Sequence, residues 1–310
     1  MAAPPLIHWD DVEPRAIEIG HLRAHWSFLG PEAGCVDIGV RRIQIEPGWF
    51  STPLHVHASD EETFFVLGGS GLSVQDDRTY ELRPGDCIVH PEGAEAHTLK
   101  AGDDGLDVLA FGVSHESGTG ARLPRAGVFW HARAWYEIAG GKSPFEREAD
   151  AGPPETPEPG ERPATIVNLA EATHSTRDRE GHRGRWCRLG HQAGAKRTNL
   201  NHVALEPGQM GAPPHCHGAE EELFVVLDGD GSVLLGEDLH PVRRGSIVAR
   251  PPATGVAHSF TAGEQGLTFL AYGPREPNDI VYYPRSNKIL FAGVSVMTRV
   301  EKLDYWDGEE

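Results

Sequence analysis

The sequence contains few cysteines, and none of them stands in a metal-binding or disulfide pattern. The 310 residues include four, Cys35, Cys87, Cys187 and Cys216, and no two of them form a Cys-x-x-Cys pair. A zinc knuckle is therefore not expected, and four widely spaced thiols in a long chain do not make the framework of a small secreted domain. We expect free thiols and a cytoplasmic protein.

Long hydrophobic runs and an excess of basic charge are missing as well. No apolar stretch reaches the about 18 residues that a membrane helix needs, and residues 1–10 lack the basic and apolar regions of a signal peptide. Only 28 Lys and Arg stand against 46 Asp and Glu, which gives a formal net charge of −18. Because such a surface repels phosphate backbones and anionic lipids, nucleic acid and membranes are not expected as partners.

Amphipathic patterns of helix length are nearly absent, whereas residues typical of turns are abundant. The 37 Gly and 24 Pro interrupt short runs of β-branched and aromatic residues. The runs expected to form strands are residues 43–46, 63–67, 71–75, 86–89 and 106–111. Strands at intervals of about 8 to 12 residues predict an all-β barrel or sandwich. Residues 128–138 are the one stretch whose pattern fits neither structure clearly.

The chain also repeats itself. Glu46-Pro47-Gly48 recurs as Glu206-Pro207-Gly208, 160 residues later, and His55-Val-His57 recurs as His215-Cys-His217 at the same offset. Later motifs recur at an offset of 161, so one residue has been gained or lost between the copies. A period of this length indicates a duplicated domain.

The repeat divides the chain into two domains of ordinary size, since domains commonly have roughly 150 residues. We expect an N-terminal barrel over residues 1–139, a linker over residues 140–163 and a C-terminal barrel over residues 164–310. Proline and glutamate dominate the linker, which predicts an extended, solvated tether. Each barrel is expected to bury its own core, so deleting residues 1–160 should leave a folded fragment.

Each copy carries three histidines and one glutamate at nearly unchanged spacing. Two histidines of a His-x-His pair share one face of a strand, and the glutamate opens the next strand, about 5 Å away. Imidazoles together with a carboxylate suit Mn, Fe, Co, Ni, Cu or Zn rather than Ca or Mg. The sequence therefore predicts up to one divalent transition metal per barrel. The predicted ligands are His55, His57, Glu62 and His97 in the first copy and His215, His217, Glu222 and His258 in the second.

Residues next to these predicted ligands are weaker candidates for metal ligands. The carboxylates of Asp60, Glu61, Glu220 and Glu221 remain alternative ligands, but Glu62 and Glu222 directly precede an apolar strand and are preferred. Cys216 lies between two histidines that face inward, so its side chain should face outward.

Alternation along the strands predicts the walls of each site. Counting from the glutamates places Phe64, Val66, Phe224 and Val226 inward. Phe111 and Tyr272 match between the copies and are expected near the metal, whereas His90 and Arg250 are expected at the rim.

At these motifs the chain resembles the cupin superfamily, and specifically a bicupin, over about residues 35–115 and 195–275. The first cupin motif has the form Gly, His-x-His, Glu, Gly, and the second has the form Gly, Pro-x-Gly, His. The residues that match are Gly48, His55, His57, Glu62, Gly69, Gly85, Pro91, Gly93 and His97, and then Gly208, His215, His217, Glu222, Gly229, Gly245, Pro251 and His258. Each copy has one extra residue after the first Gly, and the loop before His97 and the position of Gly255 also depart from the pattern.

The resemblance implies two tandem jelly-roll barrels with a metal inside one mouth of each, but it does not choose a reaction. We favour a metalloenzyme that acts on a small organic molecule by an oxygenase-like or isomerase-like reaction, alone or as a homo-oligomer. The alternatives are a non-catalytic metal-binding or small-ligand-binding protein, or one catalytic and one structural barrel, with the C-terminal barrel favoured as the catalytic one. No arginine lies inside the His-x-His motifs, which argues against oxalate as the substrate. The sequence identifies no catalytic residue beyond the ligands.

Overall fold

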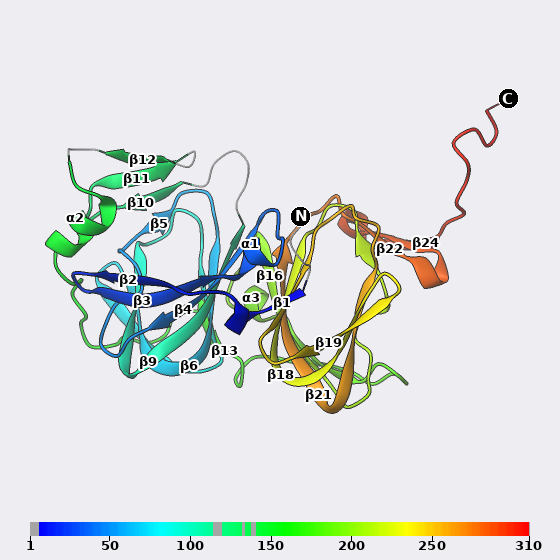
Figure 1. Ribbon diagram of the computed structural model, residues 1–310, viewed down its shortest axis with the longest axis horizontal. Coiled ribbons are helices and arrows are strands. Elements are labelled where there is room, and N and C mark those ends of the chain that lie inside the picture. Colours follow the sequence, from blue (N-terminus) through cyan, green and yellow to red (C-terminus); the bar gives the residue numbers. More distant parts are fainter. Residues whose placement is uncertain (1–5, 114–119, 132–133, 138–140, 310) are drawn as a thin grey trace.

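The computed structural model describes residues 6–113, 120–131, 134–137 and 141–309. Two β-barrels lie side by side, and each carries a small four-stranded sheet (Figure 1). This confirms the all-β fold with two tandem jelly-roll barrels. In the described part of the chain, no helix is long and apolar enough to span a membrane.

The two halves contain corresponding elements in the same order. The first half consists of β1 (Leu6–His8), the 3-10 helix η1 (Trp9–Asp11), β2 (Arg15–Ile19), β3 (Leu22–Phe28), α1 (Leu29–Glu32), β4 (Ile38–Ile45), β5 (Val56–His57), β6 (Glu62–Gln75), β7 (Arg78–Leu82), β8 (Asp86–His90), β9 (His97–Val113), β10 (Ala121–Leu123), β11 (Val128–His131), β12 (Ala134–Glu137) and α2 (Pro144–Asp150). The second half consists of β13 (Ile166–Asn168), β14 (Ser175–Arg177), β15 (Gly184–Cys187), α3 (Leu189–Gln192), β16 (Thr198–Leu205), β17 (Cys216–His217), β18 (Glu222–Leu235), β19 (Asp238–Arg243), β20 (Ser246–Arg250), β21 (His258–Pro274), β22 (Ile280–Tyr283), η2 (Pro284–Ser286), β23 (Lys288–Phe291), η3 (Ala292–Val294) and β24 (Val296–Arg299). The ambiguous residues 128–138 form strands β11 and β12 where they are described.

The strands of each barrel are longer than the sequence runs suggested. Residues 63–67 and 71–75 belong to one strand, β6, whose pairing with β9 shifts register between Gly69 and Gly71. A Cβ atom at Gly69 would lie 2.1 Å from the carbonyl oxygen of Gly105, and one at Gly71 would lie 2.2 Å from that of Lys100. Only glycine permits so close an approach, which explains the repeated Gly-x-Gly of both copies.

Two short strands are exchanged between the barrels. β1, at the start of the chain, pairs with β20 of the C-terminal barrel, and β13 pairs with β8 of the N-terminal barrel. The sheets therefore cross the predicted boundary at residues 140–163 twice. Consequently, a cut at this boundary removes an edge strand from both barrels.

The barrels also share a hydrophobic core, in addition to the core inside each. Alternate residues of β6 face different clusters: Phe64 lies in the barrel interior and Phe65 lies between the barrels. Since both faces of the strand are buried, the run Phe64–Leu67 is continuously apolar. Phe111 and Tyr272 meet in the shared core with ring centroids 4.9 Å apart, so the expectation that they lie near the metal is wrong. Each barrel does bury a core of its own, as expected, and the shared core between the barrels is an addition that the sequence did not predict.

The segment between the barrels is not a simple extended tether. It contains α2, which begins with a capping box formed by Ser143 and Glu146. Phe145 packs against the N-terminal barrel, and Glu148 is fully buried within 3.5 Å of His21 and 3.4 Å of Arg125. The sequence did not predict this helix because it has only seven residues, and the high Pro and Glu content of the surrounding segment indicated an extended chain.

Candidate metal centres

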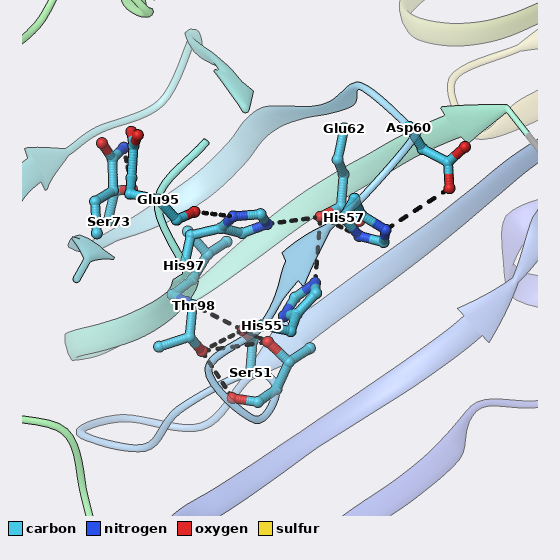
Figure 2. A network of polar contacts seen from close by, with 12 residues as sticks. Ser51, His55, His57, Asp60, Glu62, Ser73, Glu95, His97 and Thr98 are labelled. Atoms are coloured by element: carbon cyan, nitrogen blue, oxygen red, sulfur yellow. Dashed lines mark hydrogen bonds and ion pairs between the residues drawn. The ribbon is translucent and has the colours of Figure 1, made fainter. Parts of the chain in front are cut away.

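The four residues predicted as ligands in the N-terminal barrel come together at one end of the barrel. The Nε2 atoms of His97, His57 and His55 lie 3.0, 3.4 and 3.5 Å from the same atom, Oε2 of Glu62 (Figure 2). Two backbone hydrogen bonds between His55 and His97 hold the residue before β5 against the first residue of β9. One ligand atom from each of the four residues lies within 4.8 Å of the others.

The C-terminal barrel brings its predicted ligands together in a similar way, although only His215, Glu222 and His258 form one cluster within 4.8 Å. The Nε2 atoms of His258 and His217 lie 3.0 and 3.2 Å from Oε2 of Glu222. His215 belongs to the cluster as well, with its ring centroid 4.4 Å from that of His258 and 5.1 Å from that of His217. The corresponding distances in the first barrel are 4.6 and 5.0 Å.

The orientations of the imidazole rings fit a metal. Nδ1 of His55 donates to the carbonyl oxygen of Pro53 at 2.9 Å, and Nδ1 of His215 donates to that of Pro213 at 2.8 Å. A carbonyl only accepts, so each Nδ1 carries the proton and each Nε2 presents a lone pair to the site. Acceptor atoms that converge on a carboxylate need a proton or a cation between them. The donor set therefore fits a divalent transition metal.

The protonation of the cluster is consistent with this reading. Burial lowers the pKa of His97 and of His215 to about 4, against the opposing effect of the glutamates, so both imidazoles are neutral at pH 7. Burial acts to raise the pKa of Glu62 and Glu222, but the surrounding histidines outweigh it and hold both well below the usual range. Neutral imidazoles and ionised carboxylates are the forms that bind a metal. Burial acts to lower the pKa of His57 but Glu62 outweighs it and raises the value, so His57, like His217, would release a proton when a metal binds.

His217 has a further partner that the sequence did not reveal. Its Nδ1 lies 2.7 Å from Oδ2 of Asp279, which is buried and comes from the turn before β22. Burial lowers the pKa of His217, but Glu222 and Asp279 outweigh it and raise the value to about 9. No repeated motif pointed to Asp279.

The cavities beside the two clusters differ in size and charge. The N-terminal cavity has a volume of about 290 Å³, and the C-terminal cavity has a volume of about 160 Å³. Trp26, Arg41, Ile43 and Phe64 line the first beside the predicted ligands, and their counterparts Trp186, Asn201, Val203 and Phe224 line the second. The main polar difference is thus an arginine in one cavity and an asparagine in the other.

Comparison with known proteins agrees with this architecture. A model of the cupin domain matches residues 41–112 and again residues 201–271. The chain belongs to the cupin superfamily as a bicupin. No curated protein sequence matches it at a significant level.

Several solved bicupin structures share the fold. Oxalate decarboxylase from Bacillus subtilis at pH 4.6 is 16% identical, with 88% of this chain and 76% of that chain covered and a TM-score of 0.57. The formate complex of oxalate decarboxylase from Lactobacillus farciminis is 15% identical, with 86% and 85% covered and a TM-score of 0.58. At this identity the likeness shows the shared fold alone.

The bicupin structure places several neighbouring residues differently from our expectations. His90 and Arg250, expected at the rim, are buried beside Glu62 and Glu222 on the adjacent strands. The His90 ring stacks on His97 with centroids 3.7 Å apart, whereas Arg250 donates to the carbonyl oxygen of Val256 at 2.7 Å. Sequence position alone could not distinguish the rim from the floor of the barrel.

The acidic residues next to the glutamates hold the two barrels of the bicupin together. Glu61 accepts hydrogen bonds from the backbone of Lys196 and from the backbone and hydroxyl of Thr198 in the other barrel. Glu221 reciprocally accepts hydrogen bonds from three successive backbone N–H groups, those of residues 36–38. The carboxylates of Glu61 and Glu221 are thus engaged elsewhere and are absent from the described clusters of possible ligands. Glu220, by contrast, lies in a separate described cluster with His217 and Asp279. Cys216 is also absent from these clusters; it is buried, and its strand β17 pairs with β22.

Proposed function

We propose that this bicupin is a metal-dependent enzyme whose N-terminal barrel acts on a small organic anion, such as a carboxylate or an enolate. The observation that carries this proposal is the position of Arg41. Its Nη2 lies 3.5 Å from Oε1 of Glu62, and about a third of the side chain is exposed beside the predicted ligands. A guanidinium at the edge of an apolar cavity can pair with a substrate anion that would otherwise be costly to bury.

The proposed cofactor is one divalent transition metal per barrel, Mn, Fe, Co, Ni, Cu or Zn. His55, His57, Glu62 and His97 would hold it in the N-terminal barrel, and His215, His217, Glu222 and His258 would hold it in the C-terminal barrel. When bound, such an ion supplies Lewis acidity and open positions for small ligands. The protein contributes orientation through Arg41 and a largely apolar wall through Trp26 and Phe64, which limits access of water.

The lining of the N-terminal cavity favours an oxygenase-like reaction over an isomerase-like one. Apart from Arg41, the titratable residues that line this cavity are all predicted ligands, and the carboxylates of Asp60 and Glu61 line a separate neighbouring cavity. An isomerase that moves a proton between carbon atoms needs a separate acid or base, and an arginine is a poor candidate because it stays protonated. An oxygenase-like reaction of a substrate that binds as an anion makes no such demand.

The C-terminal barrel is better suited to a structural or binding role, which reverses our preference from the sequence. Its cavity is about half as large, and Asn201 replaces the arginine. The buried cation on this side, Arg250, is engaged with the loop around Val256. One catalytic and one structural barrel is therefore the division of labour that we propose.

A substrate screen tests the proposal. Metal-free protein would be loaded with each of the six metals and offered keto acids, β-diketones, hydroxy acids and small dicarboxylates, with oxygen consumption and product formation recorded. Oxalate belongs in the screen because it is the substrate named for the structural neighbours and because Arg41 removes the objection that no arginine is available.

Two variants sharpen the screen. Arg41→Ala should reduce turnover by about 100-fold or more, as expected for a lost charge-assisted contact, whereas Asn201→Ala at the equivalent position should leave most of it. Binding of these anions without turnover under any metal would instead favour the non-catalytic binding protein. Equal losses in both variants would contradict the assignment of catalysis to the N-terminal barrel.

The cytoplasmic location and the homo-oligomeric state expected from the sequence stay predictions. The four cysteines are free in the structure, as expected for a cytoplasmic protein. Sedimentation analysis would test whether the chain forms a homo-oligomer.

A further inference from the structure

Asp279 is held in place from three sides. Its Oδ1 accepts hydrogen bonds from the backbone N–H groups of Ala219 and Glu220, at 2.8 and 3.1 Å. Its own backbone carbonyl oxygen accepts from Ala292, and its backbone N–H donates to Glu276. The side chain is only 1% exposed. The carboxylate is therefore held in one orientation, and its Oδ2 takes no part in these backbone hydrogen bonds.

That remaining oxygen lies 2.7 Å from Nδ1 of His217. A carboxylate can only accept, so Nδ1 carries the proton, and Nε2 is the nitrogen that faces Glu222 at 3.2 Å. A carboxylate that fixes the tautomer and direction of an imidazole in this way supports a metal ligand from outside the coordination sphere.

We propose that Asp279 is a positioning residue of the C-terminal metal centre, which holds His217 with Nε2 directed at the metal. The inference rests on the metal ligands given under the proposed function. It adds the segment that contains Asp279 and β22 to the site, although this segment lies beyond residues 201–271, the part that matches the cupin domain. β22 pairs with β17, the strand that contains His217, so the small sheet brings the carboxylate to the ring.

In the first barrel, repeat offsets of 160 and 161 place the counterpart of Asp279 at residues 119 and 118, outside the described residues. Nδ1 of His57 lies 3.9 Å from Oδ2 of Asp60, beyond hydrogen-bond distance (Figure 2). The proposal therefore concerns the C-terminal centre, and the N-terminal centre serves as its internal control.

The decisive variant is Asp279→Asn. The amide oxygen should take the place of Oδ1, because two backbone N–H groups require an acceptor there. The amide NH₂ then faces Nδ1 of His217 and, as a donor, favours the other tautomer, in which Nε2 carries the proton and cannot bind a metal. We expect Zn²⁺ affinity of the C-terminal site to fall by about 10- to 100-fold, with the N-terminal site unchanged, as measured by competition with a chelator.

A second variant separates positioning from a merely structural role. Asp279→Ala removes the hydrogen bonds to the backbone as well, but places no donor against His217. Positioning therefore predicts a greater loss of Zn²⁺ affinity for Asp279→Asn than for Asp279→Ala, whereas a structural role predicts the reverse order. Asp238→Asn, which removes an exposed negative charge from the same barrel, is the control and should bind Zn²⁺ as the wild type does.

A measurement without metal keeps this inference distinct from the proposed function. In metal-free protein, at a pH where the ¹⁵N shifts show that His217 is neutral, the shifts should report a proton on Nδ1 in the wild type and on Nε2 in Asp279→Asn. An unchanged tautomer would overturn the role of Asp279. Wild-type protein that shows the expected tautomers but binds no Zn²⁺ in either barrel would overturn the metal function instead, and with it the positioning role.

Discussion

The two candidate metal centres of this bicupin are nearly identical in their predicted ligands and unlike in their walls. The ring-centroid distance between the second and third histidines is 6.1 Å in one barrel and 6.3 Å in the other, so the triads have kept one geometry. Around them, Arg41 is replaced by Asn201 and His90 is replaced by Arg250. Coordination geometry tolerates little change, whereas under the proposed division of labour the residues that contact a substrate need to be retained in one barrel only.

The interface shows the opposite pattern, because it has stayed symmetric. The carboxylates of Glu61 and Glu221 each accept hydrogen bonds from the backbone of the other barrel, and the rings of Phe111 and Tyr272 meet at a tilt in the shared core. Both barrels must retain their half of such an interface for either half to be stable. The residues of the interface are therefore required by the fold in both copies, whereas the residues of the cavity walls differ between the copies.

The largest effect should come from separating the barrels. A fragment of residues 164–310 loses the β1 partner of β20 and exposes Leu189, Leu223 and Ile247, which are fully buried in the shared core. Each such side chain contributes about 1.5–3 kcal/mol when buried, and a domain has only about 5–15 kcal/mol in total. We expect an aggregated or unfolded fragment by circular dichroism and sedimentation. A soluble fragment with a cooperative thermal transition would show that the copies are independent.

The next largest effect concerns catalysis and tests the inequality of the barrels. Once a substrate is found, Glu62→Gln should reduce kcat/KM by at least about 100-fold, since even residues outside the coordination sphere commonly cost 10- to 100-fold. Glu222→Gln should leave most of the activity. Equal partial losses would mean that both barrels turn over substrate, and a loss confined to Glu222→Gln would move catalysis to the C-terminal barrel.

Stability variants at the interface should show equal rather than unequal effects. Glu61→Ala and Glu221→Ala each leave three donors without their acceptor, including the buried N–H and hydroxyl of Thr198 in one case and the buried N–H of Ile38 in the other. We expect each to lower the free energy of unfolding by about 2–5 kcal/mol, as measured by urea denaturation. Glu180→Ala, at an exposed position, is the control and should have little effect. A loss of unfolding free energy in only one of the two variants would contradict the view that the two carboxylates contribute equally to the interface.

The smallest expected effect is on the pH dependence of stability and concerns Glu220, which lies near Asp279 in the C-terminal barrel. Burial, together with the nearby charge of Glu222, raises the pKa of Glu220 to about 8, above its unfolded value of about 4.5. The folded state therefore binds more protons between these two values, and its stability falls as the pH rises through this window. In metal-free protein, Glu220→Gln should make unfolding less dependent on pH between 6.5 and 8. An unchanged dependence would show that Glu220 ionises normally.

The sequence predicted the architecture and the clusters because the duplication marks them twice. The eight candidate ligands recur at fixed spacing, and the structure brings them together in two groups around Glu62 and Glu222. Both glutamates at the interface also recur, so their signal was present, but it was interpreted as an alternative ligand because neighbouring residues suggested no partner in the other barrel.

Other parts of the site depend on contacts between distant segments. Arg41 reaches the cavity because β4 and β6 both pair with β9, an order that the local pattern does not contain. Asp279 reaches His217 through the pairing of β22 with β17. Neither residue type recurs at the equivalent position of the other copy, where Arg41 corresponds to Asn201 and Asp279 to Gly118 or Thr119, so the repeat gave no help.

The metal content of single and double variants tests the central claim most directly. Purified wild-type protein, loaded with Zn²⁺ and then desalted, should contain two ions per chain by elemental analysis. His57→Ala and His217→Ala should each contain one ion, and the double variant should contain none. Stoichiometric metal retained in the double variant would contradict the assignment of the two centres.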